Sequence, residues 1–165
     1  AYKELRNSVS NALEMLDSKS FIDTVNILII DDNPTYLALL EEYLLKITNY
    51  EVNVYPNTNI NAALDVLKNN EIDICVTDYY LKNETAIDLI NQLTEQGYDL
   101  PVIVISGEST EDITSLLLNY GALDLIEKDD ITPAILDRSI RYAVRRGQID
   151  AHINNLIVEN MTLNK

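Results

Sequence analysis

The sequence has very little of several residue types, and each shortage excludes a class of protein. A single cysteine, Cys75, excludes a disulfide framework within the chain and fits a reducing compartment. A single histidine, His152, leaves no Ser-His-Asp triad and no histidine-rich metal site. No apolar run approaches the roughly 20 residues of a membrane-spanning helix. The four glycines are scattered, so there is no glycine-rich phosphate-binding loop.

The start of the chain also lacks two features. The opening residues Ala1-Tyr2-Lys3-Glu4 have neither an initiator methionine nor the apolar core of a signal peptide. We therefore expect a cytoplasmic segment excised from a longer protein. Of its 165 residues, 47% are hydrophobic, which is enough for one globular domain with a full core and some additional helix.

The charge is large, acidic and unevenly placed. The net charge is −15, and residues 129–165 contain five acidic and five basic residues, so the whole excess lies in residues 1–128. An acidic surface repels phosphate backbones, so we expect no direct binding of nucleic acid. Arg138, Arg141, Arg145 and Arg146 have the spacing of one helix face. A solvated helix face is favoured over a DNA contact, because this part of the chain is neutral as a whole.

Short apolar runs alternate with segments of helical periodicity. Strands are expected at residues 25–30, 51–55, 72–77, 101–105 and 123–127, each followed by apolar residues three or four positions apart. The strands are nearly all apolar, as is typical of strands covered on both faces. Five consecutive β-α pairs predict an α/β fold with a parallel sheet and helices on both sides.

Both ends of the chain exceed what five β-α units need. Residues 1–22 and 147–165 carry apolar residues at alternating spacings of four and three. Two interpretations stay open: helices that pack on the body, or stubs of signalling helices that join this domain to neighbours or to a second copy. We expect a helical extension at 1–22, a central domain at 23–146 and a second helical extension at 147–165.

Acidic, hydroxyl and basic residues directly follow four of the apolar runs. Taken singly, each has a simpler explanation, such as a helix cap, a turn or a solvated lysine. Because the carboxyl ends of parallel strands share one edge of the sheet, we expect all five side chains there. Three carboxylates, a hydroxyl and an ammonium form a site for a divalent cation and a phosphoryl group. The residues are Asp31, Asp32, Asp78, Ser106 and Lys128.

Four segments carry a family resemblance. They are LIIDDNP at 28–34, DICVTDYYL at 73–81, PVIVISG at 101–107, and Gly121-Ala122 leading to Lys128. Over about residues 25–146, the chain resembles the receiver domain of the two-component response-regulator family, which is common in bacterial signalling. The resemblance implies a flavodoxin-like (βα)5 three-layer sandwich with strand order 2-1-3-4-5.

The resemblance also implies the chemistry. Asp78 resembles the phosphoacceptor, which receives a phosphoryl group from a histidine kinase or a histidine phosphotransfer protein. Mg²⁺ is the implied cofactor, and it would be held by Asp31, Asp32, Asp78 and the backbone carbonyl of Tyr80. A receiver is not an enzyme in the usual sense, because it catalyses only its own phosphotransfer and slow autodephosphorylation.

Two further positions match the family pattern and two depart from it. Ser106 and Lys128 would contact phosphoryl oxygens, and Ser106 would also act as a switch residue. The second switch position, usually aromatic, is Leu125, and Asp129 stands where the family usually has proline. We therefore expect a complete phosphorylation site with an unusual coupling to the output.

Two alternative functions share part of this residue pattern. A Mg²⁺-dependent phosphatase of the haloacid-dehalogenase type also uses an aspartate nucleophile, but it needs an Asp-x-Asp motif that Asp31-Asp32-Asn33 does not supply. A pseudo-receiver would mediate interactions without phosphorylation, and the complete set of five site residues argues against it. We expect a receiver within a multidomain regulator, with a homodimer through the last helix or the flanking helices.

Overall fold

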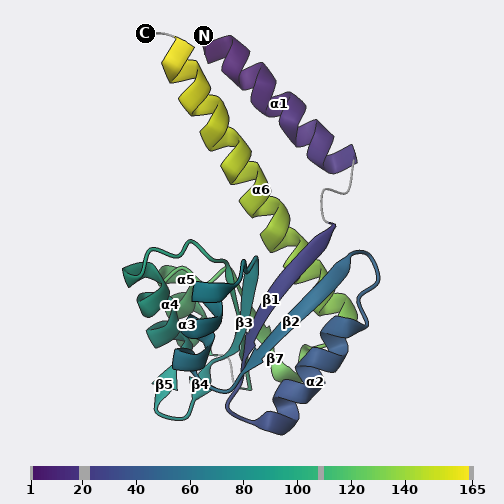
Figure 1. The fold of residues 1–165 in the computed structure, drawn as a ribbon, viewed down its shortest axis with the longest axis vertical. Coiled ribbons are helices and arrows are strands. Elements are labelled where there is room, and N and C mark those ends of the chain that lie inside the picture. Colours follow the sequence, from purple (N-terminus) through teal and green to yellow (C-terminus); the bar gives the residue numbers. More distant parts are fainter. Residues whose placement is uncertain (1, 19–22, 108–109, 164–165) are drawn as a thin grey trace.

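Five parallel strands form the central sheet (Figure 1). The computed structural model describes residues 2–18, 23–107 and 110–163. The strands lie in the order β2 (Glu51–Asn57), β1 (Thr24–Ile30), β3 (Ile74–Asp78), β6 (Val102–Ser106) and β7 (Asp124–Glu127). Numbered along the chain as the strands of this sheet alone, the order is 2-1-3-4-5. The predicted flavodoxin-like arrangement is confirmed.

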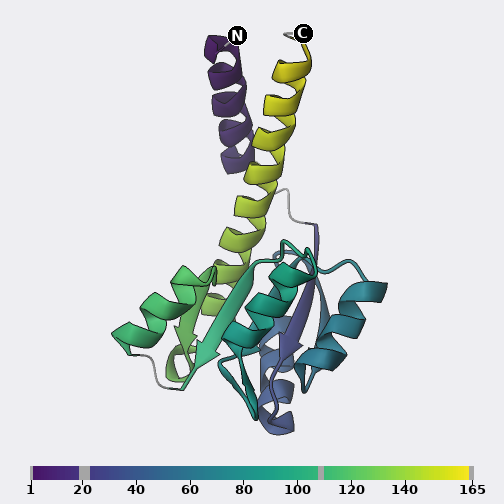
Figure 2. The same cartoon turned by 90° about the vertical axis from the view of Figure 1, so that its left-hand side faces the viewer.

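Helices cover both faces of the sheet (Figures 1 and 2). One face is packed by α2 (Pro34–Leu45) and α6 (Pro133–Leu163), and the other by α3 (Ile60–Asn69), α4 (Ala86–Glu95) and α5 (Glu111–Asn119). Every residue of β3 and β6 is buried. Parallel strands enclosed in this way have no polar face, which explains their continuous apolar sequence.

The side chains of β1 alternate between the two layers. Ile27 and Ile29 pack with α2 and α6, whereas Leu28 and Ile30 pack with α3 and α4. All four are fully buried. Burying one such side chain contributes about 1.5–3 kcal/mol. A shift by one residue would exchange the two faces, so this packing fixes the register and the place where β1 ends.

The turn after β1 leads directly into α2. Asn33 caps this helix, and its side-chain oxygen accepts hydrogen bonds from the N–H groups of Thr35 at 3.0 Å and Tyr36 at 3.4 Å. Pro34 occupies the first turn, where its missing N–H costs nothing. The sequence allowed either Asp32 or Asn33 as the cap. Because Asn33 takes that place, the Asp32 carboxylate is not used for capping.

A short hairpin that the sequence did not predict follows β3. It pairs β4 (Tyr80–Leu81) with β5 (Glu84–Thr85) in antiparallel fashion. Lys82 at its tip has φ of 58°, in the left-handed region. After β7, a single 3₁₀ turn spans Lys128–Asp130. Both segments lie at the carboxyl edge of the sheet, next to the strand ends that carry the candidate site.

The two ends of the chain form a pair of helices outside the layers. α1 (Tyr2–Ser18) lies alongside the C-terminal half of α6 and runs in the opposite direction, so both ends of the chain lie together (Figures 1 and 2). Leu5 and Val9 of α1 and Ile153 and Leu156 of α6 are half-buried. The expected helical extensions are present, and they pack on each other rather than on the sheet.

We call α1 together with residues 147–163 the stalk, and residues 24–146 the body. The expected limit after residue 146 falls inside the unbroken helix α6, and residues 19–22 lie outside the described residues. The division into three parts stays a prediction. Among the described helices, none has the length and apolarity needed to cross a membrane.

Candidate phosphoryl and metal site

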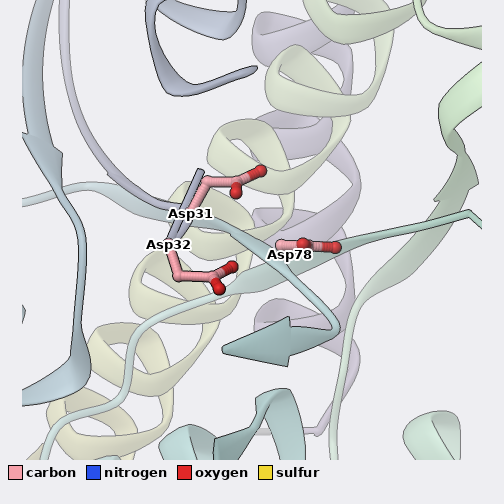
Figure 3. Close-up of side chains that lie close together, drawn as sticks. All are labelled: Asp31, Asp32 and Asp78. Atoms are coloured by element: carbon pink, nitrogen blue, oxygen red, sulfur yellow. The ribbon is translucent and has the colours of Figure 1, made fainter. Parts of the chain in front are cut away.

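Three carboxylates gather at the carboxyl edge of the sheet (Figure 3). Asp31 and Asp32 directly follow β1, and Asp78 is the last residue of the neighbouring strand β3. One oxygen from each of the three lies within 4.8 Å of the others. Asp31 and Asp78 are buried and Asp32 is half-buried. The fold thus brings together the three acids that the sequence predicted for the metal.

Asp31 is held from two sides. Its backbone N–H donates to the carbonyl of Asn57 at the end of β2, at 3.1 Å. Its carboxylate Oδ1 accepts from the N–H of Asn33 at 2.9 Å. The other oxygen, Oδ2, is buried and has no hydrogen-bond partner among the described residues. A buried carboxylate oxygen without a partner is costly, so this atom fits a site built for a cation.

The crowding of acids changes their protonation. Burial raises the pKa of Asp31 to about 6, and the charges of Asp78 and Asp32 add to this, while the Asn33 N–H and Lys128 oppose it. The pKa of Asp78 is also raised, first by burial, and Lys128 counteracts this effect. Both shifts have the direction expected where negative charges are close together and cut off from water. A cation would relieve both.

Lys128 supplies the positive charge of the site. It follows β7, two strands away from β3, and its side chain reaches back to place Nζ 3.4 Å from Asp78 Oδ2. The same Nζ lies 4.4 Å from the centre of the Tyr36 ring. Burial raises the pKa of Tyr36 to about 12, and the charges of Asp31 and Asp78 act in the same direction. The tyrosine therefore stays neutral at physiological pH.

Ser106 lies at the end of the strand between β3 and β7. It is the last residue of β6 and is only 1% exposed. Asp78 pairs with Ile105 across the sheet, and Ser106 pairs with Glu127, the residue before Lys128. This register puts the serine beside both the acid and the lysine. Asp78, Ser106 and Lys128 thus come from three adjacent strand ends, as the sequence predicted.

Two other predicted positions lie at the margin of this group. Leu125 is half-buried in β7 and packs with the residues beneath α5. Tyr80 is 60% exposed, and its ring stands edge-on to that of Tyr79 at 4.7 Å. The switch role of Leu125 and the use of the Tyr80 carbonyl as a ligand stay predictions.

Tyr36 was missed by the sequence reasoning, although a signal for it existed. Pro34 marks the first turn of a helix that starts at the carboxyl edge. A residue in that turn lies next to the strand ends. Aromatic residues in first turns are common, however, and only the path of the Lys128 side chain identifies this one as part of the site.

The four arginines of α6 differ in their exposure. Arg138 and Arg146 are exposed, whereas Arg141 and Arg145 are half-buried. Arg141 pairs with Asp137, one turn earlier, at 3.2 Å. On this helix face, Arg138 and Arg146 are therefore exposed to solvent, and Arg141 forms an ion pair within the helix.

The chain is similar in sequence to known proteins. The family model for the response regulator receiver domain matches residues 27–139. The transcriptional regulatory protein MalR of Bacillus subtilis (strain 168) is 31% identical over 104 residues, which are 63% of this chain and 44% of MalR. The putative two-component response regulator ARR13 of Arabidopsis thaliana is 30% identical over 129 residues, 77% of this chain and 22% of ARR13. The chain thus spans less than half the length of these relatives.

A solved structure agrees with this result. The crystal structure of a response regulator receiver domain protein from Clostridium thermocellum matches with a TM-score of 0.66 and 25% identity, over 76% of this chain and 98% of that one. The match therefore takes in a complete receiver fold and leaves part of this chain outside it. With the family model covering most of the body, the chain belongs to the response regulator receiver domain family of two-component systems.

Proposed function

We propose that this protein is a phosphoacceptor switch of a two-component or phosphorelay system, phosphorylated on Asp78 by a histidine kinase or a histidine phosphotransfer protein. The observation that carries the proposal is the place of the Asp78 carboxylate. It lies close to two further acids, and the Lys128 ammonium is 3.4 Å away. A nucleophile beside both a cation-binding cluster and a positive charge is suited to accept a phosphoryl group.

In the proposed reaction, an Asp78 carboxylate oxygen attacks the phosphorus of a phosphohistidine. The new O–P bond forms as the P–N bond breaks, and the bonding pair leaves on the imidazole nitrogen, which takes up a proton from solvent. The product is an aspartyl phosphate. The Lys128 ammonium pairs with one phosphoryl oxygen and the Ser106 hydroxyl donates to another, so both stabilise charge on the transferring group.

The acidic cluster fits a magnesium ion. The carboxylates of Asp31, Asp32 and Asp78 and the carbonyl of Tyr80 would hold it, and oxygen ligands of this kind are those that Mg²⁺ prefers. Support comes from the buried Asp31 Oδ2, which has no other partner among the described residues. Bound there, the ion would offset the negative charge that otherwise repels a phosphoryl donor.

The phosphorylated site would signal through its neighbours. Ser106 would move toward the phosphoryl group, and the loops after β3 and β6 would follow it. Leu125 stands at the second switch position and is smaller than the aromatic residue usual there. We propose that it transmits the change through the packing beneath α5 rather than by an aromatic rotamer.

One experiment separates this proposal from its two alternatives. The protein is incubated with Mg²⁺ and acetyl phosphate, and the intact mass and the released phosphate are measured. A receiver gains one phosphoryl group per chain. The Asp78→Asn variant should take up at least about 100-fold less phosphoryl than wild type. Asp99→Asn, an exposed acid at the opposite edge of the sheet, is the matched control and should behave as wild type.

Two other outcomes of this experiment would favour the alternative functions. Release of many equivalents of phosphate per protein would indicate a phosphatase of the haloacid-dehalogenase type. Neither uptake nor turnover, together with no binding of beryllofluoride, would indicate a pseudo-receiver that acts only through interactions.

For the assembly, we propose a cytoplasmic multidomain regulator that forms a homodimer through the stalk. Support comes from exposed apolar side chains in the C-terminal half of α6, among them Ile157 at 39%, Val158 at 61% and Met161 at 62%. Light scattering should give a dimer mass, and Ile157→Ser should lower it. A monomer mass both with and without beryllofluoride would contradict the dimer.

A further inference from the structure

The proposed phosphoryl transfer does not use the cation–ring contact between Lys128 and Tyr36. The lysine Nζ lies 4.4 Å from the ring centre and 3.4 Å from Asp78 Oδ2. At such a distance an ammonium is attracted by the negative face of an aromatic ring. The ammonium is thus held from two sides, by the proposed nucleophile and by the ring.

The ring is itself held in place by its own helix. Tyr36 is in the first turn of α2, and its N–H donates to the side chain of the capping residue Asn33 at 3.4 Å. The half-buried ring packs against the apolar cluster beneath α2 and α6. The cap therefore fixes the backbone and the cluster fixes the side chain. A ring anchored in this way can orient a flexible partner.

The Lys128 side chain needs to be oriented. A lysine side chain has a flexible four-carbon stem and a compact charge, and three acids lie at this edge of the sheet. Without a guide, the ammonium is free to turn toward Asp31 or Asp32, where it would occupy the place proposed for the cation. The ring face attracts the ammonium but offers no carboxylate, so it holds the lysine Nζ where it is, 3.4 Å from Asp78 Oδ2, without adding negative charge.

We propose that Tyr36 is a positioning residue that holds the Lys128 ammonium over its ring, beside Asp78, for phosphoryl transfer. The proposal rests on the proposed function. It concerns the ring face and not the hydroxyl, so phenylalanine should replace tyrosine and leucine should not.

The test compares Tyr36→Phe and Tyr36→Leu in the full chain, with acetyl phosphate as donor and Mg²⁺ present. Phosphorylation of Tyr36→Phe should stay within about twofold of wild type, and Tyr36→Leu should be about 10-fold slower. In a Lys128→Met background, Tyr36→Leu should have no additional effect, because the ring acts through the lysine. Equal rates for Tyr36→Leu and wild type, or an equal slowing in the Lys128→Met background, would overturn the proposal.

A second readout needs no phosphoryl transfer. Protons that lie over an aromatic ring are shifted upfield in an NMR spectrum. The ε-methylene protons of Lys128 should show this shift in wild type and in Tyr36→Phe and lose it in Tyr36→Leu. Its absence in wild type would refute the positioning role. If the shift is present but no variant takes up phosphoryl, the proposed function fails and the contact stands.

Discussion

The body encloses its strands between two layers of helices, whereas in the stalk one helix lies against another. In the body, the strands β3 and β6 are buried at every residue. In the stalk, the residues at the contact, such as Leu5 and Ile153, are only half-buried. Burying an apolar side chain stabilises the fold in proportion to the apolar area removed from water. The same residue type therefore contributes less stability in the stalk than in the body.

The two regions are both acidic. The body has 21 acidic and 8 basic residues, a net charge of −13, and the stalk has five acidic and two basic residues, a net charge of −3. Because the stalk is much shorter, its charge per residue is close to that of the body, so burial and not charge distinguishes the two regions. The comparison teaches that the body buries its central strands completely within its own layers, while the stalk leaves the apolar side chains that the structure describes there at most half-buried.

The largest change to the molecule separates the two regions. A chain of residues 23–146 should fold and take up phosphoryl at Asp78 within about twofold of the full chain, because the site is built entirely from strand ends of the body. Uptake is measured by intact mass with acetyl phosphate and Mg²⁺, and circular dichroism confirms folding. A folded body without uptake would show that the stalk belongs to the site.

The next effect contrasts equal substitutions in the two regions. Ile29→Ala removes a fully buried side chain from the sheet and should lower the free energy of unfolding by about 2–5 kcal/mol. Ile153→Ala in the stalk should cost under about 1 kcal/mol, because that side chain is only half-buried. Urea unfolding followed by circular dichroism measures both. Equal losses would mean that the stalk is as well packed as the body.

The smallest change to the molecule concerns one charge in the body and its dependence on pH. The folded-state pKa of Asp31 is about 6, above its ordinary value of 3.8. Between these two values the folded protein binds more protons than the unfolded chain, so this group makes the metal-free protein less stable as pH rises. Above about pH 6 the cost is complete and amounts to at most about 3 kcal/mol.

Asp31→Asn tests this effect, since its amide oxygen can still accept from the Asn33 N–H. The variant should be more stable than wild type at pH 7 without metal, and the difference should shrink toward pH 4. Urea unfolding in chelator at pH 4, 5, 6 and 7 measures it. Asp99→Asn, the same substitution at an exposed acid on the opposite edge of the sheet, gives the matched control. A difference between Asp31→Asn and wild type that does not change with pH would contradict the role of burial and charge crowding.

Much of the body was predictable because its signals are local. The apolar runs before Asp31, Asp78, Ser106 and Lys128 located the strands to within a few residues, and parallel pairing then places their ends at one edge. The hairpin after β3 was not predictable, because two-residue strands carry no periodicity. The sequence also left open whether Asn33 or Asp32 caps α2, because both residue types cap helices well.

The stalk was predictable only in part. The spacing of Ile149, Ile153 and Leu156 predicted a helix with one apolar side. Nothing in a single amphipathic helix specifies its partner, so its packing on α1 rather than on the body became visible only in three dimensions.

By itself, the sequence determined the fold class, the strand ends and the five residues that the fold brings to the candidate site, because periodicity and residue type act locally along the chain. Only the tertiary structure decided the contacts between distant segments. The ring of Tyr36 meets the ammonium of Lys128 because the strand order, the helix cap and the reach of one side chain combine. Contacts of this kind depend on distances across the fold, which spacing along the chain does not encode.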